Sequence, residues 1–98
     1  MYEYLSKDPL NISEYVKSLL ENKKDDEISM KISALEKDGE TFYGVDSCYK
    51  GDLDSVIEYR SIDYRNIKNY LETRIRDNMN SLEISAYDGF YDVATIKD

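Results

Sequence analysis

The sequence predicts one α+β domain over residues 1–98, a two-layer sandwich with the element order α-β-β-β-α-β-β. Two segments repeat apolar residues with the period of a helix, whereas several others alternate apolar and polar residues as strands do. Glycine-containing turns separate neighbouring strand segments, which indicates an antiparallel sheet. Both helices are expected on one face of this sheet.

Pro9 marks the entry to the first predicted helix. Asn11 can cap this helix, and Glu14 can complete a capping box. The polar run 22–26 then ends the helical pattern. The apolar side of the helix carries Ile12, Tyr15, Val16, Leu19 and Leu20.

Two strands are expected next, joined by a tight turn. Residues 28–34 alternate apolar and polar side chains, as in a strand that is buried on one face. The turn 37–40 contains a glycine that allows a positive φ. Residues 41–49 then return as the second strand, in which Cys48 is expected to be a small core residue.

A third strand and a second helix follow. Residues 55–60 are predicted as a strand, with a helix over 53–60 as the alternative. Ser61 or Asp63 can cap the second helix, which should run to about Asn80. Its apolar side carries Tyr64, Ile67, Tyr70, Leu71, Ile75 and Met79.

The chain should end in a hairpin of residues 82–87 and 90–96, because Asp88-Gly89 between alternating segments is a strong turn signal. A two-residue loop places Ile84 opposite Val93 and directs one set of apolar residues to the core. The opposite, open face of the sheet would carry Ser29, Lys31, Ser33, Glu83, Ser85 and Tyr87. No internal repeat is visible in the sequence.

Composition favours binding over catalysis. The chain has no histidine, which removes the usual proton carrier and metal ligand at neutral pH, so we expect no enzyme activity, cofactor or metal. The formal net charge of −8 opposes direct binding to nucleic acid. The basic stretch 60–76 is expected to form the solvated side of the second helix and to pair with nearby acids. The single cysteine and the absence of a long apolar run indicate a cytoplasmic protein away from membranes.

Acidic clusters and a tyrosine-rich hairpin are the candidate binding residues. Alternate residues of a strand lie about 6.7 Å apart, close to the phosphate spacing along a nucleic-acid strand. Carboxylates on strands and turns could therefore imitate a phosphate backbone, although solvated loops and stabilising aromatic pairs are the simpler interpretations. The candidates are Asp25, Asp26, Glu27, Glu36, Asp38, Glu40, Asp46, Asp52, Asp54, Glu58, Tyr87, Asp88, Tyr91 and Asp92.

A short N-terminal helix, a hairpin turning at Lys37-Asp38-Gly39-Glu40, and strong acidity in a small chain resemble small phage-encoded inhibitors. These include anti-CRISPR and antirestriction proteins, some of which mimic nucleic acid. The resemblance implies a non-enzymatic inhibitor, monomeric or homodimeric, of a basic nucleic-acid-binding protein such as a nuclease or CRISPR effector. The basic stretch 60–76 departs from a pure mimic. An immunity protein or antitoxin against a toxin nuclease, or a small assembly subunit, remains an alternative.

Overall fold

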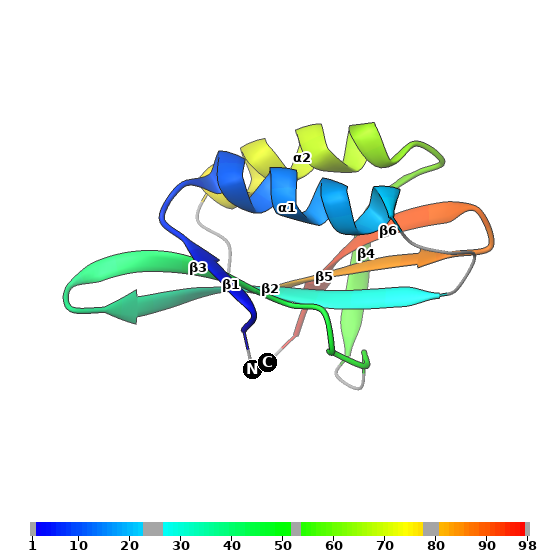
Figure 1. Ribbon diagram of the computed structural model, residues 1–98. Helices are drawn as coiled ribbons and strands as arrows, with labels where there is room; N and C mark the ends of the chain where they lie inside the picture. The colour runs from blue at the N-terminus through cyan, green and yellow to red at the C-terminus, as the bar shows by residue number, and fades with distance from the viewer. Residues whose placement is uncertain (1, 23–26, 52–53, 78–80, 98) are drawn as a thin grey trace.

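The computed structural model describes residues 2–22, 27–51, 54–77 and 81–97. Two helices cover one face of a six-stranded antiparallel sheet, as Figure 1 shows, and this confirms the predicted α+β sandwich. From the first helix onward, the predicted element order is also confirmed. The elements are β1 (Tyr4–Ser6), α1 (Pro9–Glu21), β2 (Ile28–Lys37), β3 (Glu40–Asp46), β4 (Ser55–Ser61), α2 (Tyr64–Arg76), β5 (Ser81–Tyr87) and β6 (Phe90–Ile96).

The strands lie in the order β1-β3-β2-β5-β6-β4, so β2 and β5 form the centre of the sheet. The register predicted for the last hairpin is confirmed, with Ile84 opposite Val93. Strand β1 was not expected, because three residues are too few to show an alternating pattern. It joins the sheet by pairing Tyr4 with Val45 of β3.

The expectation that the chain lacks an internal repeat is wrong. The chain consists of two β-α-β-β units, β1-α1-β2-β3 and β4-α2-β5-β6, and the strand order is symmetric about the β2–β5 pair. Seven identical residues recur at a separation of 55 positions in and before the two helices. The pairs are Glu3 and Glu58, Tyr4 and Tyr59, Ser6 and Ser61, Asp8 and Asp63, Asn11 and Asn66, Ile12 and Ile67, and Tyr15 and Tyr70.

The repeated polar residues build the same helix cap twice. In α2, the Asp63 side chain accepts a hydrogen bond from the backbone N–H of Arg65 (2.9 Å), which confirms Asp63 as the cap. In α1, Asp8 performs this role, accepting from the N–H of Leu10 (2.9 Å). The predicted cap at Asn11 is therefore wrong: Pro9 begins the helix, which places Asn11 inside its first turn.

The repeated aromatic residues join each helix to the first strand of its own unit. Tyr4 stacks on Tyr15 with ring centroids 4.4 Å apart, and Tyr59 stacks on Tyr70 at 4.3 Å. The hydroxyl at the helical position donates in each case to a glutamate, Tyr15 to Glu3 and Tyr70 to Glu58. Tyr15 and Tyr70 thus pack against the core, as expected for the apolar sides of the helices, and each hydroxyl binds a glutamate.

The hydrophobic core lies between the helices and the sheet. Its fully buried members come from both units and include the aliphatic residues Ile12, Val16, Leu20, Ile67, Leu71 and Ile75 from the predicted apolar sides of the helices. The tyrosines of those sides are partly buried and pack against the core, and Met79 lies outside the described residues. The fully buried members are Ile12, Val16, Leu20, Met30, Ile32, Val45, Ile67, Leu71, Ile75, Leu82, Ile84, Ala86 and Val93.

Three local expectations need correction. Strand β3 ends at Asp46, so Cys48 lies after it and is exposed instead of buried in the core. The face expected to be open is partly covered, because Ser33 and Glu83 are buried. Helix α2 ends at Arg76, with Asp77 as its C-terminal cap. The predicted helix end at 78–80 lies outside the described residues.

The basic stretch forms ion pairs along α2 and its approach, as predicted. Arg65 pairs with Asp63 at 2.8 Å, and Lys68 pairs with Glu72 at 3.5 Å. Lys68 also reaches Glu14 of α1 at 3.4 Å, which ties the two neighbouring helices together. Most of the positive charge in this stretch is therefore matched by acids of the same chain.

Candidate functional site

Three of the predicted acids lie at the tip of the β2–β3 hairpin, which projects beyond the helices at one end of the molecule (Figure 1). Glu36, Asp38 and Glu40 are exposed there. Glu40 forms an ion pair with Lys7 at 2.8 Å, and Glu36 accepts a hydrogen bond from the Thr41 hydroxyl at 2.6 Å. Two of these three acids are thus already engaged within the chain.

Other predicted acids are fixed inside the fold. Glu58 binds Arg74 at 2.8 Å, and its carboxylate also accepts hydrogen bonds from the hydroxyls of Tyr70 and Thr95. The side chain of Asp92 is only 4% exposed. These two carboxylates stabilise the second unit and offer little surface to a partner.

Several further candidates lie apart from one another. Asp46 accepts a hydrogen bond from the backbone N–H of Cys48, Asp54 is exposed at the start of β4, and Tyr91 packs edge-on against Tyr64. Candidates Asp25, Asp26 and Asp52 lie outside the described residues.

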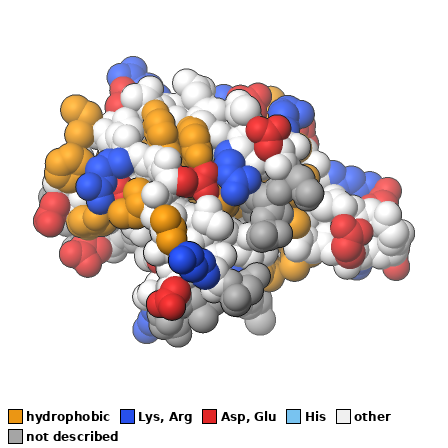
Figure 2. Space-filling model, turned by 180° about the vertical axis from the view of Figure 1, so that it is seen from behind, with side chains coloured by type: hydrophobic (Ala, Val, Ile, Leu, Met, Phe, Trp, Pro, Cys, Tyr) orange, Lys and Arg blue, Asp and Glu red, His pale blue; other side chains and the backbone are white. Residues whose placement is uncertain are grey.

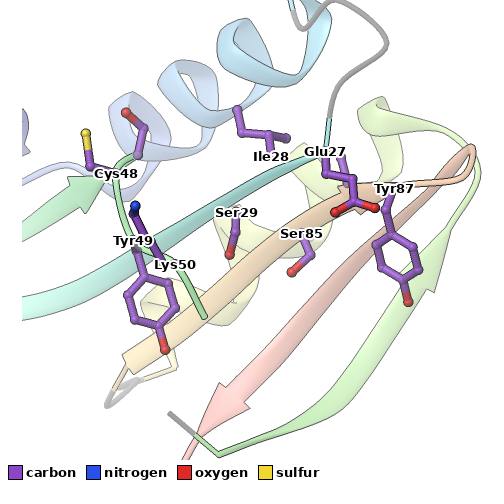
Figure 3. A pocket seen from close by; sticks show the side chains of 10 residues that line it. Glu27, Ile28, Ser29, Cys48, Tyr49, Lys50, Ser85 and Tyr87 are labelled. Carbon is purple, nitrogen blue, oxygen red and sulfur yellow. The ribbon is translucent and has the colours of Figure 1, made fainter. Parts of the chain in front are cut away.

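A groove on the partly covered face brings together two candidates from distant acidic segments. Its volume is about 560 Å³, and Figure 3 shows Glu27 and Tyr87 side by side at one end, with Tyr49 and Lys50 at the other. Ser29 and Ser85 lie between the two ends. The lining residues are Glu27, Ile28, Ser29, Ser47, Cys48, Tyr49, Lys50, Ser85, Ala86 and Tyr87.

Strand pairing explains why Glu27 meets Tyr87. Ile28 of β2 lies opposite Ala86 of β5, so the residue before Ile28 and the residue after Ala86 are neighbours across the strands. Side chains alternate between faces, which places Glu27 and Tyr87 on the same side of the sheet as Ser29 and Ser85. The central β2–β5 junction between the two units therefore creates this end of the groove.

The hydroxyl of Tyr87 is held by the ion pair between Arg60 and Asp92. Its hydroxyl donates to Asp92 (2.8 Å) and accepts from Arg60 (3.1 Å), while Arg60 also binds Asp92 at 2.6 and 3.1 Å. The hydrogen bonds from Arg60 hold the pKa of Asp92 below its ordinary value despite burial. The hydrogen bond to Asp92 raises the pKa of Tyr87. The ring consequently forms a fixed wall at the acidic end of the groove.

The segment between the two units forms the opposite wall. The Lys31 ammonium lies 5.9 Å from the centre of the Tyr49 ring, which links this wall to β2. Beneath it, Glu83 accepts hydrogen bonds from the hydroxyls of Ser29 (3.2 Å) and Ser55 (2.9 Å). Gly51, which follows Tyr49 and Lys50, therefore lies close to a buried carboxylate.

Gly51 is required where this connecting segment approaches the sheet. Its φ is +67°, and a Cβ at this position would lie 2.5 Å from an Oε of Glu83. We expect Gly51→Ala to lower the free energy of unfolding by about 1 kcal/mol or more, because the backbone is strained for alanine and Glu83 must move. Urea denaturation measures this loss, with Gly39→Ala as the control: Gly39 also has a positive φ, but a Cβ there meets nothing within 4 Å. Equal losses in the two variants would show that the contact with Glu83 adds nothing.

The sequence predicted the binding candidates Glu27 and Tyr87 at one end of the groove but not Tyr49 and Lys50 at the other. Glu27 and Tyr87 stand in acidic and aromatic segments that a composition pattern reveals. Tyr49 lies in a segment predicted as strand, and its position in the groove depends on how the chain passes from one unit to the next. Ser29 and Ser85 were predicted only as open-face residues, and their register opposite each other was the available signal.

No family model, curated protein or solved structure matches this chain. Within the four described stretches, no group of three or more His, Cys, Asp or Glu side chains is placed to hold a metal ion. Neither α1 nor α2, the helices of the described residues, is long and apolar enough to cross a membrane. The geometry of the groove and the distribution of charge therefore carry the functional argument.

Proposed function

We propose that this protein is a non-enzymatic inhibitor that binds a basic, nucleic-acid-handling protein, as small anti-CRISPR-like inhibitors do. The groove between Glu27, Tyr49 and Tyr87 would receive a lysine or arginine side chain of that protein. The observation that carries this proposal is the meeting of Glu27 and Tyr87 at one end of an open groove. A carboxylate beside an aromatic ring can attract a cation through charge and through the face of the ring.

The charge of the chain supports the same class of partner. A net charge of −8 favours encounter with a basic surface and disfavours nucleic acid itself. The acids at the β2–β3 hairpin lie outside the groove and would contribute to this long-range attraction more than to direct contact.

Affinity capture from a cell lysate tests the proposal, with the purified protein immobilised and the wash performed at low and at high salt. Bound protein should be basic, and it should be released by high salt and by added double-stranded DNA or RNA. Retention that neither salt nor nucleic acid affects would contradict binding at a nucleic-acid site.

Charge reversal at Glu27 should weaken binding to the captured protein by about tenfold or more, because it places a cation where the partner's cation would bind. The matched control is Glu21→Lys, which makes the same charge change at an exposed residue of α1. Isothermal titration calorimetry measures both affinities. If the two reversals cost the same, only overall charge matters and the groove is not the contact.

A further inference from the structure

Strand β4 ends the sheet with a long, apolar edge. It has seven residues, whereas β1 at the opposite edge has three. Val56 and Ile57 of β4 are 49% and 50% exposed, and Ile62 just beyond it is 75% exposed. Figure 2 shows hydrophobic side chains gathered towards the end of the molecule opposite the projecting hairpin. An exposed apolar edge strand is a template for pairing with another strand.

The repeat shows that two of these exposed apolar positions are covered or charged in the first unit. At the position equivalent to Ile62, the first unit has Lys7, which forms an ion pair with Glu40. At the position equivalent to Ile57 it has Tyr2, whose ring lies against Gly44: a Cβ on that glycine would be 2.9 Å away. Lysine and a covering side chain blunt an edge strand, so the first edge has two protections that β4 lacks. The protection within β4 is the irregularity in its pairing between Ile57 and Tyr59.

The charge around β4 favours a second copy of this chain over a basic partner. The nearby ion pairs Arg60–Asp92 and Arg74–Glu58 leave the edge almost neutral, although each copy carries a net charge of −8. Repulsion between two copies is therefore reduced here. The strand follows the acidic Asp54 and ends near Arg60, whose side chain is half exposed. Antiparallel pairing of two identical strands sets Asp54 of each copy at the Arg60 end of the other strand, so the two Asp54 carboxylates do not face each other.

We propose that β4 pairs antiparallel with β4 of a second copy and joins the two sheets into one. The two-fold axis would be perpendicular to the sheet, which keeps all four helices on one face and leaves both grooves accessible on the other. The contact is apolar and made by the backbone, so high salt should not weaken it. Partner binding through the groove should be weakened by salt, which separates the two proposals.

Sedimentation velocity over a range of concentrations tests this pairing. We expect a species of twice 11.5 kDa that persists at high salt. Ile57→Lys should raise the dimer dissociation constant by about tenfold or more, since it places a charge in the contact. The control is Leu5→Lys on the β1 edge, where Leu5 is 49% exposed. A monomer at every concentration would overturn the proposal, as would a dimer that Leu5→Lys disrupts and Ile57→Lys does not.

Amide hydrogen exchange tests the pairing in the unmodified protein, so the result does not depend on whether a variant folds. The backbone N–H groups on the free side of β4 should exchange more slowly as concentration rises, while those of β1 should not change. Circular-dichroism melting of the lysine variants identifies any that fail to fold. Exchange in β4 that is independent of concentration would contradict the pairing.

Discussion

Alanine at Ile12 or at Ile67 is expected to lower the free energy of unfolding by about 2–5 kcal/mol, and by a similar amount at the two positions. Both side chains are completely buried and occupy equivalent positions of α1 and α2 in the repeat. Each variant removes the same atoms and leaves a cavity in the core between its helix and the sheet. Similar losses would show that the two units contribute equally to one core.

Urea denaturation at neutral pH measures both losses, and Leu10→Ala is the control because Leu10 is exposed on α1. The control should change the free energy of unfolding by less than about 1 kcal/mol. A single cooperative transition is expected for all three variants, since the core is shared between the units. Two transitions, or a large loss at only one of the two isoleucines, would show that the units fold separately.

The sequence predicted the elements well because their signals are local. Ile12, Val16 and Leu20 carry the helix period, and the turns at Asp38-Gly39 and Asp88-Gly89 carry the signature of tight hairpins. At each turn, the aspartate and the glycine both have positive φ, which a two-residue hairpin loop of this type requires. Such signals depend on a few neighbouring residues and not on the rest of the chain.

The repeat was missed because its identical residues are mostly polar and widely spaced. Glu3 and Glu58, or Ser6 and Ser61, do not alter a hydrophobic pattern, and their role in joining strand to helix is visible only in three dimensions. The strands of the two hairpins also differ in length, because β2 has ten residues and β5 has seven. A direct comparison of the chain with itself would have found the seven identities.

Only part of the candidate site could be predicted, because the position of each side chain depends on three-dimensional contacts. Composition identified the acids, but it could not distinguish Glu27 at the groove from Asp92, which is buried against Arg60. The distinction depends on which face of a strand a side chain occupies and on which cation lies next to it. Both properties follow from the register in which the strands pair. The β4–β6 pairing has an irregularity between Ile57 and Tyr59, which the alternation of apolar and polar residues did not predict.

Low pH is expected to destabilise the fold, and Glu58→Gln should remove part of that dependence. Burial alone would raise the pKa of Glu58, but hydrogen bonds from Thr95, Tyr70 and Arg74 outweigh it and hold the pKa below the ordinary 4.5. A carboxylate with a lowered pKa in the folded state contributes stability above its unfolded pKa. This contribution is lost as pH falls through the folded value.

Thermal melting from pH 7 down to pH 2 measures the effect. At neutral pH, Glu58→Gln should cost about 1–3 kcal/mol, because it leaves Arg74 and two hydroxyls without their charged acceptor. Below pH 4 its stability should approach that of the unmodified protein, whereas the exposed control Glu21→Gln should follow the unmodified protein throughout. A Glu58→Gln curve parallel to the unmodified one would show that this carboxylate does not titrate with unfolding.

The same network should also weaken at high pH, through its tyrosine. Burial and the hydrogen bond to Glu58 raise the pKa of Tyr70 to about 12 from 10.0. A raised pKa in the folded state contributes stability below the unfolded value, and this is lost as pH rises through about 12. Tyr15 bonds to Glu3 in the equivalent position, and its pKa is likewise raised to about 12. Tyr70→Phe should therefore flatten the alkaline limb of the melting curve, and Tyr15→Phe should do the same, because the repeat places a phenol on a glutamate in each unit.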